Sequence, residues 1–140
     1  MCELAWSVAA GESAAIPPLL RELHPAVSAY CRARARVAGK SFGEADHLAL
    51  EVCRSILAGL SAPTGADRPF LRLAYSFVLD AADRGFGARG DVPITRVQQD
   101  ILILRTIVGL DPEQTAVAMA LSPRRIRTEQ HAALLSLRAA

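Results

Sequence analysis

Five side chains near the C-terminus have the types and the spacing needed to bind an anion: Arg124, Arg125, Arg127, Thr128 and His131. Arg124 and Arg125 fall in the first turn of a predicted helix, where the helix dipole disfavours cations. Arginines at that end are better explained by a bound anion, and phosphate is the anion we expect. The alternative is a solvated basic surface on an ordinary helical hairpin.

Two short helices joined by a tight turn, within Leu110 to Arg138, must position these side chains. Asp111 is a good N-cap, Pro112 suits the first helical position, and Gln114 completes a capping box. Ser122-Pro123 repeats this start for the second helix. The apolar side of that helix is predicted to hold Ile126, Gln130, Ala133, Leu134 and Leu137. The pattern predicts a helix-turn-helix, which lays its second helix in the DNA major groove.

Three enzyme-like patterns lack the context that their chemistry needs. Glu44 and His47 have the Glu-x-x-His spacing of carboxylate-bridged metal sites, but the chain has no second copy of it. Cys53 with His24 or His47 has no supporting nucleophile motif. The glycine pattern at 85–90 matches a dinucleotide fingerprint, yet no strand precedes it. We therefore expect a protein that is not an enzyme and that binds no cofactor or metal.

The composition predicts an all-α protein. The 140 residues are 51% hydrophobic but only 5% aromatic, and they are rich in alanine and leucine, so one domain or two small ones are expected. The net charge of +2 does not by itself demand nucleic acid. Three cysteines without a CxxC pair indicate a reducing cytoplasm. We expect neither a signal peptide nor a membrane span.

Turn residues divide the predicted helices into two small modules. Residues 1–16 are expected to be a frayed lead-in, with a short helix that docks Trp6 on the body. A helical domain follows over 17–84, a Gly- and Pro-rich linker over 85–93, and the helix-turn-helix domain over 94–140. Further helices are predicted from Pro17 to Val37, Glu44 to Leu60, Pro69 to Ala82, and Val97 to Val108.

Several stretches together resemble the extracytoplasmic-function (ECF) group of bacterial RNA polymerase sigma factors. Region two of that family is similar to Leu23 to Arg34, Glu44 to Cys53, and Arg68 to Phe70 with Tyr75. Region four is similar to Asp100 to Arg105, Val108 to Leu110, Glu113 to Ala116, and Gln130-His131 with Leu134 and Leu137. The order and spacing of these stretches cover most of Leu20 to Arg138, and they make the resemblance fairly specific although no single motif is diagnostic.

The resemblance implies two helical modules that bind RNA polymerase core and promoter DNA. In the family, region two grips the polymerase clamp, recognises the minus-10 element and opens the duplex, while region four reads the minus-35 element. The five C-terminal side chains would then contact DNA. The polymerase- or partner-binding helix would carry Asp46, His47, Leu50, Glu51, Arg54 and Leu57. An anti-sigma factor or another regulatory protein is a further candidate partner.

Four departures from the family pattern leave a second hypothesis open. His47 and Leu50 replace a second acid and a glutamine on the acidic helix, and residues 76–83 are acidic and apolar where the family's strand-opening segment is basic. The linker is shorter than is usual. Ala120 replaces a turn glycine, which is tolerable if its φ is negative. Besides an ECF-like sigma factor, the chain is therefore compatible with a sigma-derived regulatory or protein-interaction module that has lost promoter melting.

Overall fold

The computed structural model describes residues 1–87 and 89–140, and this part of the chain is entirely helical. The α-helices are α1 (Cys2–Ala9), α2 (Ile16–Val37), α3 (Phe42–Ser61), α4 (Phe70–Phe86), α5 (Arg96–Leu102), α6 (Pro112–Met119) and α7 (Pro123–Ala139). A 3₁₀ turn, Ser13–Ala15, precedes α2, and a π-helical segment, Ile103–Val108, continues α5. The all-α prediction is confirmed.

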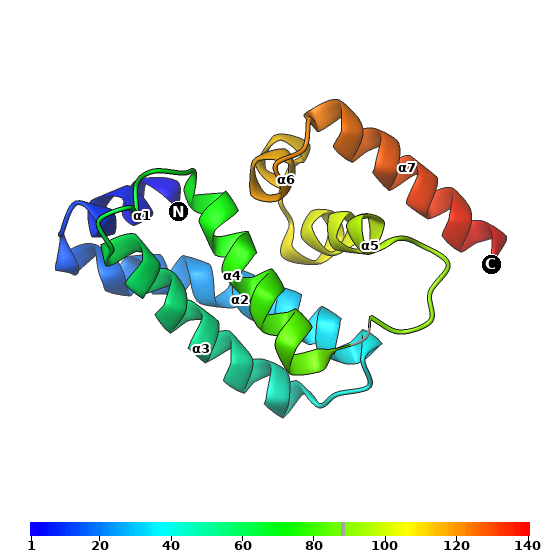
Figure 1. The fold of residues 1–140 in the computed structure, drawn as a ribbon, viewed down its shortest axis with the longest axis horizontal. Coiled ribbons are helices and arrows are strands. Elements are labelled where there is room, and N and C mark those ends of the chain that lie inside the picture. The colour runs from blue at the N-terminus through cyan, green and yellow to red at the C-terminus, as the bar shows by residue number, and fades with distance from the viewer. Residues whose placement is uncertain (88) are drawn as a thin grey trace.

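Helices α1 to α4 form an N-terminal bundle (Figure 1). Helix α3 begins at the predicted turn, where the Ser41 hydroxyl accepts from the Glu44 backbone N–H and the Glu44 carboxylate accepts from that of Ser41. Helix α1 docks through Ala5 and Val8, which are 1% and 4% exposed. The predicted docking of Trp6 is wrong, because this side chain points about 100° away from that face and is 56% exposed.

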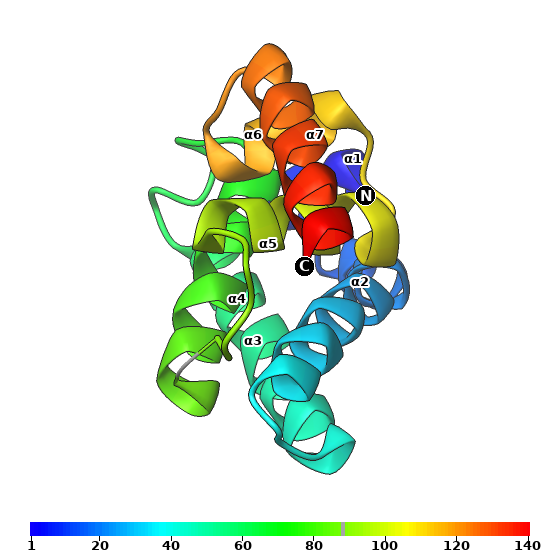
Figure 2. The same ribbon diagram turned by 90° about the vertical axis from the view of Figure 1, so that its right-hand side faces the viewer.

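Helices α5 to α7 lie against one side of this bundle (Figures 1 and 2). Helix α6 packs on α4 and the π-helical segment packs on α2, whereas α7 packs on α5 and α6 at the outer edge of the molecule. Buried Ile103, Leu104 and Ala118 join the apolar core of the bundle. The two halves of the chain are therefore in direct contact. The predicted DNA-reading helix, α7, lies on the side of α5 and α6 that is away from the bundle.

The helix expected from Val97 to Val108 is present but is not uniform. It runs as an α-helix to Leu102 and then widens into the π-helical segment. Gly109, with φ of 92°, ends it at the predicted C-cap position. Arg105 donates to the Leu110 carbonyl over 2.8 Å and to the Gln130 side chain over 3.1 Å. The end of this helix is thereby tied to α7.

Ala120 ends α6 in a left-handed conformation, with φ of 56°. The condition under which alanine would be tolerated here, a negative φ, is therefore not met. The tight turn into α7 needs a residue in this conformation, and the Leu121 N–H then bonds the Ala116 carbonyl over 3.0 Å. A β-carbon in this conformation is strained by about 1 kcal/mol.

Replacing Ala120 with glycine should raise the free energy of unfolding by about 1 kcal/mol, because glycine adopts this φ without the β-carbon clash. Urea unfolding followed by circular dichroism measures it. In the matched control, Ala132→Gly, the new glycine lies inside α7 and should instead lower the free energy of unfolding by about 1 kcal/mol. Equal destabilisation by both variants would contradict a strained turn.

Candidate functional site

The start of α7 is built by local capping. The Ser122 hydroxyl accepts from the Arg125 backbone N–H over 3.1 Å, and Pro123 occupies the first helical position. This cap places Arg124 and Arg125 in the first turn, as predicted. Helix α6 begins with the predicted capping box of Asp111 and Gln114.

Helix α7 buries a narrower face than its sequence pattern predicts. Ile126 and Ala133 are fully buried against α5 and α6, and Gln130 is half-buried. Leu134 and Leu137 were also expected on the inner face, but they are 47% and 40% exposed. The supporting helices have only seven and eight residues, against 17 in α7, so they do not cover its last turns.

The five predicted anion-binding residues of α7 are all exposed on the outside of the molecule: Arg124, Arg125, Arg127, Thr128 and His131. Arg127 pairs with Glu113 of α6 over 3.1 Å, and Arg125 lies 3.9 Å from Glu129. Arg124 has no ion pair or side-chain hydrogen bond within residues 1–87 and 89–140. This surface, which we call the α7 basic face, can accept an anionic partner without rearrangement of the fold.

Glu113→Gln should tighten binding of duplex DNA two- to fivefold. The Glu113 carboxylate competes with phosphate for Arg127 and adds a negative charge beside the α7 basic face, and an exposed ion pair of this kind is worth up to about 1 kcal/mol. Fluorescence anisotropy of a labelled duplex measures the change. Gln114→Glu, which adds a charge at the neighbouring position, should have the opposite effect.

The second predicted surface lies on α3, and both of its acids already have partners within the chain. Asp46 accepts two hydrogen bonds of 2.8 Å from Arg32, which hold the pKa of this carboxyl below its usual range. Arg32 also stacks on Phe42, 4.9 Å from the ring centre. His47 and Glu51 lie 3.1 Å apart. An approaching cationic partner would therefore have to displace Arg32 from Asp46 and the His47 ring from Glu51.

The apolar residues of this surface differ in exposure. Leu50 is 49% exposed, and Arg54 beside it is exposed as predicted, whereas Leu57 is half-buried and packs against the bundle core. Leu57, one of the predicted partner-binding residues, is therefore only partly available to a partner. Leu50 alone presents a large apolar surface on this part of α3.

The acidic segment 76–83 does not present all of its acids to solvent. Asp80 pairs with Arg84 over 2.9 Å on the surface of α4. Asp83 accepts from Arg34 over 2.6 Å and from Arg96 over 2.9 Å, and so links α4 to α2 and α5. Asp83 contributes to the acidic character by which this segment differs from the family pattern, but in the structure it makes contacts within the chain.

A buried polar cluster around Asp100 was not found from the sequence. This aspartate is 1% exposed and accepts hydrogen bonds from Tyr30 over 2.9 Å, from Tyr75, and from Arg89 over 2.5 Å. Burial, and then the Asp100 charge, raise the pKa of both tyrosines above the ordinary value. The only sequence signal was an acid within the apolar helix from Val97 to Val108.

The enzyme-like patterns have structural explanations. Glu44 caps α3. Cys53 is a buried free thiol, and burial raises its pKa above the ordinary value, which makes it a poor nucleophile. Across residues 1–87 and 89–140, no group of His, Cys, Asp and Glu side chains is arranged to hold a metal ion. Within the same residues, no helix is both long enough and apolar enough to cross a bilayer.

Comparisons with known proteins connect this arrangement to characterised relatives. No protein-family model matches the chain. The ECF RNA polymerase sigma factor SigD of Mycobacterium tuberculosis is 31% identical in an alignment 166 positions long, gaps included, which spans 92% of this chain and 78% of SigD. The ECF sigma factor ShbA of Streptomyces griseus is 25% identical in an alignment 169 positions long, which spans 92% of this chain and 88% of ShbA.

A solved structure shares the fold. CnrH, determined in complex with the cytosolic domain of CnrY, superposes with a TM-score of 0.69 at 19% identity, over 97% of this chain and 93% of CnrH.

Proposed function

The chain belongs to the ECF group of RNA polymerase sigma factors, and from that membership we propose that it directs RNA polymerase core to promoters and contacts promoter DNA through α7. The observation that supports the DNA-binding role is the α7 basic face, because it is exposed, lies at the outer edge of the fold and includes Arg124, which has no ion-pair partner among residues 1–87 and 89–140. Arg124, Arg125, Arg127, Thr128 and His131 are the proposed DNA contacts.

The two halves of the chain take different parts of this task. Residues 17–84, after the lead-in 1–16, correspond to the polymerase-binding module, and residues 94–140, after the linker 85–93, to the upstream DNA-reading module. The proposed polymerase or partner contacts are Asp46, His47, Leu50, Glu51, Arg54 and Leu57 on α3. The protein itself performs no covalent chemistry, since the bound polymerase makes the transcript. An anti-sigma factor or similar regulator is a further proposed partner.

A second function is favoured by the surface of α3 and α4. Asp46 and Glu51 are internally paired, and Leu50 is exposed where the family pattern has a polar residue. In segment 76–83 the acids face cations of this chain rather than a DNA strand. These features favour a sigma-derived module that binds a protein partner and no longer melts promoters.

Run-off transcription separates the two functions. Purified protein is added to core polymerase on two DNA templates. The first is a duplex that carries the region upstream of the protein's own gene. The second is the same duplex with non-complementary bases across the region that is melted. Transcripts from the closed duplex support a complete sigma factor, whereas transcripts from the pre-melted template alone support binding without melting. If neither template gives a transcript and the chain fails to co-purify with polymerase, the sigma role is refuted.

A further inference from the structure

The Asp100 carboxylate links α5 to three other parts of the chain. Its hydrogen-bond donors are Tyr30 on α2, Tyr75 on α4, and Arg89 in the segment after α4, while Asp100 itself lies on α5. The aspartate is 1% exposed and the Arg89 side chain is 10% exposed, so water competes little for these bonds. Every bond of this carboxylate therefore crosses from α5 to the preceding part of the chain.

A second layer of charges surrounds the first. Arg34 of α2, also 1% exposed, donates to the Tyr30 hydroxyl over 2.9 Å and to Asp83 over 2.6 Å. Arg96 of α5 bonds Asp83 over 2.9 Å. Buried ionic groups of this kind contribute more to the choice of one arrangement than to net stability, and loss of one partner leaves an uncompensated charge. The cluster is therefore selective for the docked arrangement of the two halves.

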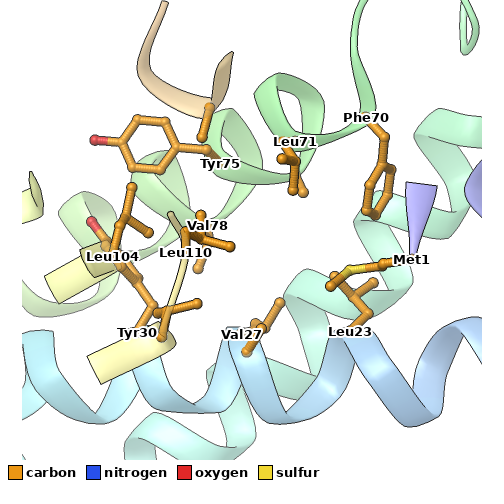
Figure 3. Close-up of a pocket in the computed structure, with 14 residues that line it drawn as sticks. Met1, Leu23, Val27, Tyr30, Phe70, Leu71, Tyr75, Val78, Leu104 and Leu110 are labelled. Carbon is orange, nitrogen blue, oxygen red and sulfur yellow. The ribbon is translucent and has the colours of Figure 1, made fainter. Parts of the chain in front are cut away.

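The apolar part of the interface between the two halves of the chain is incompletely filled. A hollow of about 60 Å³ lies between the halves, lined by residues that include Val27, Ala74 and Val78 on one side and Leu104 and Leu110 on the other (Figure 3). The hollow is smaller than the roughly 150 Å³ cavity that accommodates benzene. A permanent protein core is normally packed without such space. The interface between the halves therefore holds space that close-packed side chains would fill, although Ile103, Leu104 and Ala118 belong to the same apolar core as the bundle.

We propose that the Asp100 cluster is a releasable lock that holds α5 to α7 closed against α2 and α4, and that it opens when the two halves engage polymerase and promoter DNA at separate positions. The opening of the lock on polymerase and promoter DNA rests on the proposed function. In the closed arrangement α6 and the π-helical segment cover parts of α4 and α2, but α7 stays exposed. The lock therefore controls the separation of the halves and leaves the α7 basic face accessible.

Asp100→Asn tests the lock, because it keeps the size of the side chain but removes the charge that pairs with Arg89. Dyes are attached to exposed Cys2 and to an Arg138→Cys substitution, since buried Cys31 and Cys53 will not react in the folded chain. Single-molecule energy transfer should show the open population rise at least tenfold, as expected for lost hydrogen bonds to a charged group. Asp46→Asn is the matched control, because its two bonds to Arg32 lie within the N-terminal bundle, and it should leave the dye distance unchanged.

The two tyrosines give a second readout that needs no dye. They are the only tyrosines of the chain, and both contact Asp100. Two cations of the cluster oppose these shifts: Arg34 of α2 acts on Tyr30, and Arg89 acts on both tyrosines. Asp83 of α4 contacts Arg34 and Arg89. With both pKa values raised, native protein should show little tyrosinate absorbance at pH 10 to 11, where an exposed tyrosine of pKa about 10 ionises. The closed state is then stabilised below about pH 10 and weakened as the pH rises above it.

In Asp100→Asn the tyrosinate absorbance should appear at a lower pH than in the native protein, because the Asp100 charge no longer raises the pKa of either tyrosine. Tyr30→Phe combined with Tyr75→Phe should open the chain in the dye experiment. The double variant keeps the test decisive if Asp100→Asn fails to fold, as judged by circular dichroism. An unchanged dye distance in a folded lock variant, together with an unchanged titration in Asp100→Asn, would overturn the proposal. Neither readout uses polymerase or DNA, so failure of the sigma role and failure of the lock give different results.

Discussion

Replacing Arg124 and Arg127 together with alanine should weaken the binding of promoter DNA about a hundredfold. Both side chains lie on the exposed face of α7. Loss of an arginine that contacts a base should cost about 1–3 kcal/mol, and loss of one that contacts phosphate should lower the salt dependence of binding by about one unit of slope. Anisotropy titrations at several salt concentrations measure both quantities. A strong loss of affinity with little change in slope would identify base readers, and a reduced slope would identify phosphate contacts.

Arg54→Ala is the control for this variant, because it also removes an exposed arginine but does so on α3, in the N-terminal bundle. It should leave the affinity for free DNA within twofold and weaken co-purification with polymerase instead. Equal loss of DNA affinity in both proteins would mean that net charge, and not the α7 basic face, governs binding. Full affinity in the Arg124 and Arg127 variant would refute the assignment of α7.

Features encoded within four residues were predictable from the sequence. The predicted capping box of Asp111 with Gln114 is present, and Gly109 ends its helix in the left-handed conformation at the predicted position. Each of these features depends on a hydrogen bond or a backbone preference of adjacent residues, so its energy does not depend on the rest of the fold. The order of the helices follows from such signals.

Burial was less predictable where it depends on the reach of a neighbouring element. Leu134 and Leu137 continue the apolar side of α7, yet no helix extends far enough to cover them. Trp6 is the largest apolar side chain of α1 and still lies outside, because Ala5 and Val8 fit closer to the bundle. The left-handed conformation of Ala120 similarly depends on the angle between α6 and α7, because this residue forms the turn between them.

The Asp100 cluster lay beyond any local pattern. Tyr30 and Tyr75 reach this carboxylate from 70 and 25 residues away, and Arg89 comes from a segment that the sequence presents only as a linker. Periodicity places Asp100 on a mostly apolar helix but gives no partner for its charge. Only the docking of the halves brings the donors together.

Ile126→Ala should detach α7 and abolish DNA binding while the N-terminal bundle stays folded. Ile126 is fully buried in a small core with Ile101 and Ala116 that lies apart from the main core. Removing the isoleucine should cost about 2–5 kcal/mol through lost burial and the resulting cavity. Because this cluster buries little apolar surface, the loss of the Ile126 side chain removes a large part of the free energy that holds α7 in place. Amide hydrogen exchange should show loss of protection in α7 with α2 and α3 unaffected.

Leu134→Ala is the matched control, because it removes a large apolar side chain from the same helix at a position 47% exposed. It should change the free energy of unfolding by less than about 0.5 kcal/mol, as surface substitutions usually do. If the two variants destabilise α7 equally, the apolar side of the helix must be covered more broadly than the fold shows. Loss of protection in α2 and α3 of Ile126→Ala would mean that the two halves unfold as one cooperative unit, and that opening of the lock costs as much as unfolding the chain.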